Sequence, residues 1–151
     1  MSKINYVVGD ATQPNARPAI IAHICNTAGG LGKGFSGAIS KRWPGPEKYY
    51  RAMKHRRLGW IGAIEVESGI CVANMIAQRR YSKPGLPAID YQALEVCLRD
   101  LVDYAMRTSS SVHMPRVGTD WAGGDWAVIE PIIERTLCAR GVSVTVYDLP
   151  K

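Results

Sequence analysis

Two glycine-rich stretches stand where a chain could hold an anionic ligand. The first, NTAGGLGKGFSG at residues 26–37, has five glycines and one lysine directly after an apolar run that ends in HIC. The second, MPRVGTDWAGGDW at residues 114–126, also follows a short apolar run and precedes a helical pattern. Glycine is kept where backbone must turn sharply or come close to something, and helix starts favour phosphate. We interpret both stretches as parts of a ligand cradle.

Neither of the common nucleotide-binding motifs fits the first stretch. A P-loop requires Ser or Thr after its Gly-Lys pair, but Gly34 follows Gly32 and Lys33. Residues 32–37 match G-x-G-x-x-G, yet they begin eight residues after Ile24, the end of the predicted strand, and no acidic residue lies about 20 positions further on. The sequence therefore does not indicate a dinucleotide dehydrogenase.

Strand and helix patterns alternate along the chain. Buried or alternating apolar runs predict strands at 4–8, 19–24, 61–66, 70–76, 112–114 and 142–147. Helical patterns cover 36–43, 46–57, 90–107 and 125–139, with Asp125 as a cap and Pro131 as a kink or the end of a first turn. This alternation predicts a three-layer α/β fold with a mixed central sheet.

Composition limits the classes of protein to consider. The chain has 151 residues, 46% of them apolar, and no linker-like segment, so we expect one domain over residues 1–151. Its first residues, MSKINYVVGD, are too polar for a signal peptide, and no apolar run is long enough to cross a bilayer, so we expect a cytoplasmic protein without a membrane partner. The four cysteines lack C-x-x-C spacing, and we expect no metal site.

The net charge of +6 favours an anionic partner, either a phosphorylated small molecule or a nucleic acid. Charge does not decide between these two. The short basic runs at 54–57 and 79–80 suit a solvated face or a helix end better than a nucleic-acid footprint.

Five segments, in order along the chain, resemble the macrodomain family. They are YVVGD, AHICN with the glycines that follow it, VANMIAQ, MPRVG with AGGDW, and VTVYDL. The resemblance covers nearly the whole chain and points to the small branch that includes ADP-ribose 1″-phosphate phosphatases and terminal ADP-ribose glycohydrolases. It implies a three-layer α/β/α fold with a mixed sheet, an ADP-ribose ligand and no cofactor.

The resemblance also assigns binding residues. Asp10 would accept the exocyclic amine of adenine, with the Ala11 backbone beside it, and Tyr147 would lie against the adenine ring. Asn26 would contact the hydroxyls of the distal ribose. The two loops would supply the remaining contacts, from Gly30, Leu31, Gly32, Lys33 and Gly34 in the first and from Val117, Gly118, Thr119, Asp120, Trp121 and Ala122 in the second.

Each of these side chains also has a structural interpretation. Asp and Asn are common turn residues at strand ends, and a tyrosine in a strand commonly packs against its neighbours. Lys33, between two glycines, could point into water.

Catalytic expectations follow from matches and mismatches with the family. His23 and Asn26 would lie beside the terminal phosphate in a phosphatase, and His23 would serve as an acid or base. Its alternative is a buried core histidine with a backbone partner. Glycohydrolases of this branch use a lysine and an aspartate at positions that here hold Gln78 and Ala122. An amide cannot form the covalent adduct of an amine. Asp120 could supply a displaced carboxylate, or cap the loop.

The sequence thus predicts a protein that binds ADP-ribose and hydrolyses a derivative of it, with ADP-ribose 1″-phosphate as the leading substrate. The alternatives are a binding module without turnover and a glycohydrolase that acts on ADP-ribosylated protein or nucleic acid. A nucleic-acid binder without this pocket rests only on the basic charge and the aromatic residues.

Overall fold

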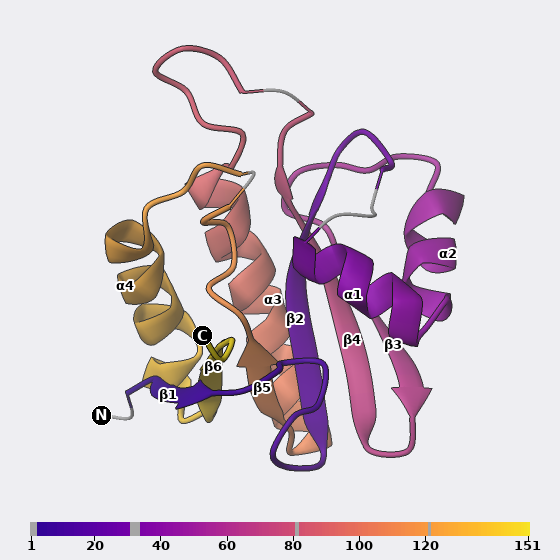
Figure 1. The fold of residues 1–151 in the computed structure, drawn as a ribbon, viewed down its shortest axis with the longest axis vertical. Helices are drawn as coiled ribbons and strands as arrows, with labels where there is room; N and C mark the ends of the chain where they lie inside the picture. The colour runs from indigo at the N-terminus through magenta and orange to yellow at the C-terminus, as the bar shows by residue number, and fades with distance from the viewer. Residues whose placement is uncertain (1–2, 31–33, 81, 121) are drawn as a thin grey trace.

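A six-stranded mixed sheet forms the centre of the molecule (Figure 1). The computed structural model describes residues 3–30, 34–80, 82–120 and 122–151. The strands are β1 (Asn5–Val8), β2 (Ala19–Asn26), β3 (Ile61–Glu67), β4 (Ile70–Gln78), β5 (Ser111–Met114) and β6 (Val144–Asp148). Their order is β1-β6-β5-β2-β4-β3, and all neighbours are parallel except the antiparallel pair β3 and β4.

Helices cover both faces of this sheet. Helices α1 (Gly34–Arg42) and α2 (Gly45–Ala52) lie on the face turned to the viewer in Figure 1. Helix α3 (Tyr91–Thr108) packs behind the sheet, beside α4 (Trp126–Thr136) and a short 3-10 turn, Cys138–Arg140. The predicted three-layer α/β/α fold with a mixed sheet is confirmed.

Strand β2 is buried on both faces, and its alternate side chains enter two different cores. Ile20 and Ala22 pack with α3 and α4, while Ile21 packs with Ile39 of α1. Because side chains alternate along a strand, His23 faces the same side as Ile21, under α1. The continuous apolar run is the sequence signal of this double burial.

Two predicted helices end earlier than expected. The helix predicted over 46–57 ends at Ala52, because Met53 is extended and the Arg56 guanidinium folds back to donate to the carbonyls of Tyr50, Arg51 and Met53. A helix end was one of the two structural roles that we preferred for the basic run at residues 54–57. The helix predicted over 125–139 ends at Thr136 before the 3-10 turn.

Aspartates cap both long helices, and the cap at Asp125 was predicted. The carboxylate of Asp125 accepts from the Ala127 N–H at 2.9 Å, and Asp90 accepts from the Ala93 N–H at 2.9 Å. Pro131 lies within α4 without dividing it. No helix in the described part of the chain is long and apolar enough to cross a membrane.

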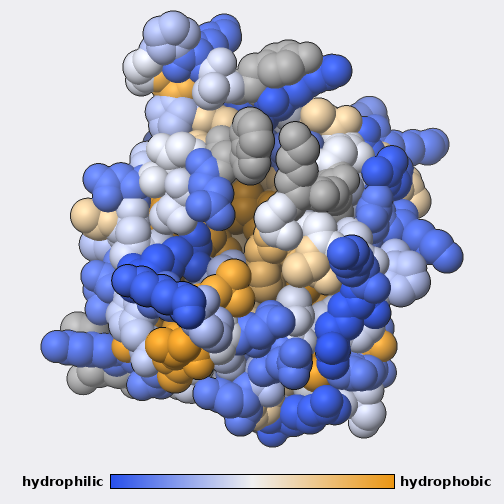
Figure 2. Space-filling view, viewed as in Figure 1, coloured by the Kyte–Doolittle hydropathy of each residue, from blue (hydrophilic) through white to orange (hydrophobic). Residues whose placement is uncertain are grey.

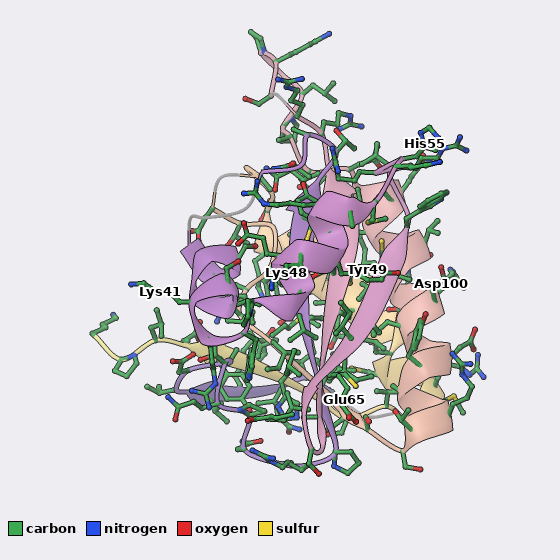
Figure 3. All side chains as sticks on the ribbon, turned by 90° about the vertical axis from the view of Figure 1, so that its right-hand side faces the viewer. Lys41, Lys48, Tyr49, His55, Glu65 and Asp100 are labelled. Carbon is green, nitrogen blue, oxygen red and sulfur yellow. The ribbon has the colours of Figure 1, made fainter. Side chains whose placement is uncertain are left out.

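Two of the buried polar residues are histidines. His23 and His113 are each 1% exposed, and burial lowers the pKa of each to about 4. Both rings are therefore neutral at pH 7. His55, by contrast, is exposed in the segment after α2 and points away from the sheet (Figure 3).

We expect these two histidines to make stability depend on pH. In the unfolded chain a histidine binds a proton below its ordinary pKa of about 6.5, whereas the folded chain resists it down to about 4. The contribution of the two neutral histidines to the free energy of unfolding is complete above pH 6.5 and is lost as the pH falls toward 4. Linkage gives a loss of about 2 kcal/mol per histidine between about pH 7.5 and pH 5. Urea unfolding over this range measures it.

The control is His55→Gln, which replaces an exposed ring rather than a buried one. His113→Gln should remove about half of the slope. A wild-type free energy of unfolding that is flat between pH 7.5 and pH 5 would contradict the expectation.

Candidate ligand-binding site

A cavity of about 340 Å³ opens at the carboxyl ends of the parallel strands β2, β5 and β6. Ligands of open α/β sheets bind at this edge. Figure 2 shows a hollow near the middle of the molecular surface that is turned to the viewer. Apolar side chains lie in this hollow, and hydrophilic side chains border it. The lining comes from the end of β2 and the start of α1 (His23, Ile24, Gly34, Phe35, Ser36), from Gln78, from the loop after β5 (Pro115, Arg116, Val117, Gly118, Thr119, Asp120, Ala122) and from the end of β6 (Tyr147, Asp148, Leu149).

The first glycine loop is folded around the side chain of Asn26. Its Oδ1 accepts from the N–H groups of Ala28 at 2.8 Å and Gly29 at 3.2 Å, and its Nδ2 donates to the Gly30 carbonyl at 3.0 Å. The Tyr50 hydroxyl of α2 lies 2.7 Å from Oδ1 and accepts from the Gly29 N–H at 2.9 Å. Asn26 thus shapes this loop, and its side chain does not line the cavity.

A backbone hydrogen bond closes the second glycine loop. Gly118 has φ +80°, a left-handed conformation, and a Cβ there would lie 2.5 Å from Ile89 Cδ1. Its carbonyl accepts from the Gly124 N–H at 2.7 Å, and a Cβ on Gly124 would lie 2.5 Å from that same oxygen. Glycine is required at Gly118 by its left-handed backbone and at Gly124 by the close approach of the Gly118 carbonyl. The hydrogen bond between them holds residues 117–120 against the cavity.

His23 lies at the floor of the cavity, with both ring nitrogens hydrogen bonded. Nδ1 is 3.0 Å from the Ser36 hydroxyl, and Nε2 is 2.5 Å from Oδ1 of Asn74 on β4. Because burial lowers its pKa to about 4, the ring is neutral at pH 7. His23 is therefore a core histidine, as the structural alternative expected, but its partners are side chains rather than backbone.

The start of α1 offers hydrogen-bond donors to the cavity. Gly34, Phe35 and Ser36 form its first turn and all line the cavity. The first N–H groups of a helix have no acceptor within the helix and carry its positive partial charge. An anionic group in the cavity would find these donors.

On the opposite side, the end of β6 is fixed by polar contacts. The Tyr147 hydroxyl accepts from the Asn15 N–H at 2.9 Å and lies 2.7 Å from Nδ1 of His113. Arg116 donates to both carboxylate oxygens of Asp148, at 2.8 and 3.1 Å, which lowers the pKa of that carboxyl. Tyr147 is 5% exposed, so what it offers a ligand is the part of its side chain at the cavity wall.

Asp10 lies outside the cavity lining, at the end of β1. Its Oδ1 accepts from the N–H of Thr12 at 2.8 Å and from the Thr12 hydroxyl at 2.7 Å. The side chain therefore forms a turn, and Ala11 beside it is buried.

The predicted site residues fall into three groups. The cavity brings together His23, Gly34, Gln78, Val117, Gly118, Thr119, Asp120, Ala122 and Tyr147. It does not include Asp10, Ala11, Asn26 and Gly30 in its lining. The remaining predicted residues, Leu31, Gly32, Lys33 and Trp121, lie outside the described residues.

Seven lining residues were not predicted: Ile24, Phe35, Ser36, Pro115, Arg116, Asp148 and Leu149. Most of them adjoin predicted residues in the chain, so their place beside a glycine loop or a strand end was the available signal. Ser36 has a second signal, because a serine in the first turn of a helix after a glycine loop is well placed to face a ligand. Within the described ranges, no three His, Cys, Asp or Glu side chains are grouped to hold a metal.

Solved structures with this fold are similar to the chain over its whole length. A protein of unknown function from Bacteroides thetaiotaomicron is 42% identical, covers 97% of this chain and 98% of its own, and has a TM-score of 0.93. A macrodomain protein from Streptomyces coelicolor is also 42% identical, covers 97% of this chain and 99% of its own, and has a TM-score of 0.84.

More distant proteins share the fold or part of the sequence. Chromodomain-helicase-DNA-binding protein 1-like from Danio rerio is 32% identical over 95% of this chain, which spans only 15% of that protein. An ADP-ribose 1″-phosphate phosphatase from Meyerozyma guilliermondii is 26% identical over 74% of this chain and 61% of its own length. Thermosipho africanus DarTG, solved in complex with ADP-ribose, is 18% identical over 87% of this chain and 38% of its own, with a TM-score of 0.68.

No family model matches the chain. The Streptomyces coelicolor protein nevertheless shares well over a third of its residues with it across nearly the full length of both. On this likeness in sequence and fold, the chain belongs to the macrodomain family.

Proposed function

We propose that this chain binds ADP-ribose in the cavity and hydrolyses a derivative of it. The carrying observation is that the second glycine loop and the start of α1, which follows the first glycine loop in the chain, line one cavity on the carboxyl edge of three parallel strands. Backbone N–H groups suit a diphosphate there. The ADP-ribose held by Thermosipho africanus DarTG supports the choice of ligand.

The two ends of the cavity suit the two ends of ADP-ribose. Strand order separates β6 from β2 by the width of β5. Asp10, at the end of β1 beside β6, has its Oδ1 bound to Thr12, while no described residue donates to its Oδ2. In our proposal Oδ2 accepts the exocyclic amine of adenine, near Tyr147 and Leu149. The terminal ribose then reaches the β2 and α1 side.

Asp10→Asn tests this orientation. The variant can keep the oxygen that binds Thr12 and present an amide NH₂ where Oδ2 was, so the adenine amine would meet a donor. We expect ADP-ribose to bind about 5- to 100-fold more weakly, the loss of one polar contact of about 1–3 kcal/mol, measured by calorimetry.

The matched control is Asp100→Asn, an exposed carboxylate on α3 (Figure 3). It should leave the affinity unchanged. Equal affinities of wild type and Asp10→Asn would remove Asp10 from adenine recognition, whatever the ligand does elsewhere.

The geometry favours Asp120 over His23 as the group that acts on water. His23 is buried and neutral, and Asn26 has its amide engaged within its own loop. Of the two carboxylates that line the cavity, Asp148 is paired with Arg116, whereas Asp120 is exposed in the second loop. In our proposal Asp120 orients or deprotonates the attacking water. The leading substrate is ADP-ribose 1″-phosphate, which the name of the Meyerozyma guilliermondii relative supports.

Asp120→Asn should separate turnover from binding. A general base is typically worth about 100- to 10,000-fold, so kcat should fall by that much while ADP-ribose affinity changes little. Parallel incubation with ADP-ribose 1″-phosphate, an ADP-ribosylated glutamyl protein and ADP-ribosylated DNA, with product analysis, identifies the substrate. Unchanged turnover by folded Asp120→Asn would exclude the role of this carboxylate, and absence of turnover by the wild type would leave a binding module.

Gln78 generates a separate expectation about mechanism. Gln78 lines the cavity, and by the family resemblance it stands where the glycohydrolases have their lysine. An amide forms no imine with an opened ribose. Incubation with ADP-ribosylated protein and a borohydride reductant should therefore give no adduct by mass spectrometry. An adduct on Lys33 or Lys83 would restore lysine chemistry.

A further inference from the structure

A row of four hydrogen-bonded groups runs from α2 across one face of the sheet to the cavity. The Asn74 Nδ2 donates to the Pro46 carbonyl at 3.0 Å, and its Oδ1 lies 2.5 Å from Nε2 of His23. Nδ1 of His23 lies 3.0 Å from the Ser36 hydroxyl. His23 and Asn74 are direct neighbours in the pairing of β2 with β4, so both side chains stand on the face that α1 and α2 cover.

The direction of every bond in this row follows from its first member. A backbone carbonyl only accepts, so the Asn74 amide must turn its NH₂ to Pro46 and its oxygen to His23. An amide oxygen also only accepts, so the proton of the neutral ring is on Nε2, and Nδ1 carries a lone pair. The reverse orientation would set two oxygens together in a buried site, at a cost of about 1–3 kcal/mol.

The Ser36 hydroxyl is the last group and receives its direction from His23. Nδ1 can only accept, so the Ser36 proton points to it. The other acceptor near this hydroxyl is the Ile24 carbonyl at 3.4 Å, which also lies in the protein. With either partner the proton is directed inward, and the Ser36 oxygen offers lone pairs to the cavity that it lines.

We propose that Ser36 selects the ligand by accepting a hydrogen bond from a hydroxyl of the terminal ribose. His23 and Asn74 are positioning residues that fix its polarity. Phosphate oxygens only accept, so they would meet a lone pair here and are directed to the backbone N–H groups of the loops instead. The inference rests on the proposed ADP-ribose function. It adds that the hydroxyl bound by Ser36 is one other than the 1″ hydroxyl that carries the phosphate in the proposed substrate, and that a terminal ribose blocked at this other hydroxyl is excluded.

The ribose is assigned to the terminal end because of strand order. Ser36 lies in the first turn of α1 beside β2, across β5 from Tyr147 and the proposed adenine position on β6. ADP has the adenosine and the diphosphate but no terminal ribose, which makes it the matched ligand for the test.

Calorimetry with ADP-ribose and ADP on wild type, Ser36→Ala and Ser36→Thr provides the test, with thermal melts to show that each variant is folded. A neutral hydrogen bond contributes about 0.5–1.5 kcal/mol, so Ser36→Ala should weaken ADP-ribose about 3- to 10-fold and leave ADP unchanged. Ser36→Thr keeps a hydroxyl and should restore most of the affinity. Equal losses for both ligands would place a phosphate at Ser36 and overturn the proposal, as would no loss for ADP-ribose.

The polarity itself is tested without a ligand. Long-range ¹H–¹⁵N spectra of the labelled full chain at pH 7 should show His23 protonated at Nε2 alone. Protonation at Nδ1 would overturn the inferred direction, even if ADP-ribose binds. Failure of the wild type to bind ADP-ribose would instead overturn the proposed function, and with it the ribose assignment, while the histidine spectrum would still report the direction of the row.

Discussion

Strand β2 is the constraint on which the other elements depend. It pairs with β4 on one side and β5 on the other, and both of its faces are buried. Any polar side chain on such a strand must find a partner inside the protein, because an unpaired buried polar group costs about 1–3 kcal/mol. His23 is that side chain, and Asn74, Pro46 and Ser36 are the partners that satisfy it. This requirement connects β4, α2 and α1 to one position on one strand.

The cavity draws little of its attraction for anions from charged side chains. Its described charged lining consists of Arg116, which is paired with Asp148, and of Asp120. The net charge of +6 is therefore carried mainly elsewhere on the chain. Backbone N–H groups at the start of α1 and in the second glycine loop are the donors that suit a diphosphate. This agrees with the number of glycines at the site, since close backbone approach needs residues without a Cβ.

The sequence predicted the layers of the fold because its signals there are local. The apolar run of β2, the helical period of α3 and the Asp125 cap of α4 are all contained in short stretches. The end of α2 was missed because the residue that terminates it, Arg56, acts through a backward fold of its side chain onto three carbonyls. Residue patterns carry no record of that geometry.

The site was predicted in outline and missed in its polar detail. Strand ends followed by glycine loops predicted the edge of the sheet at which the cavity opens. The pairing of His23 with Asn74 spans 51 positions and depends on the register of two strands, which no local pattern reveals. Asn26 was assigned to a ligand by resemblance, while in the fold its amide organises the loop that follows it.

The Tyr50 hydroxyl of α2 contacts the loop that follows Asn26. Residues 26–30, the part of this loop held by α2, have already lost much of their conformational entropy on folding, so a ligand need not supply that ordering, and more of its contact energy remains as affinity.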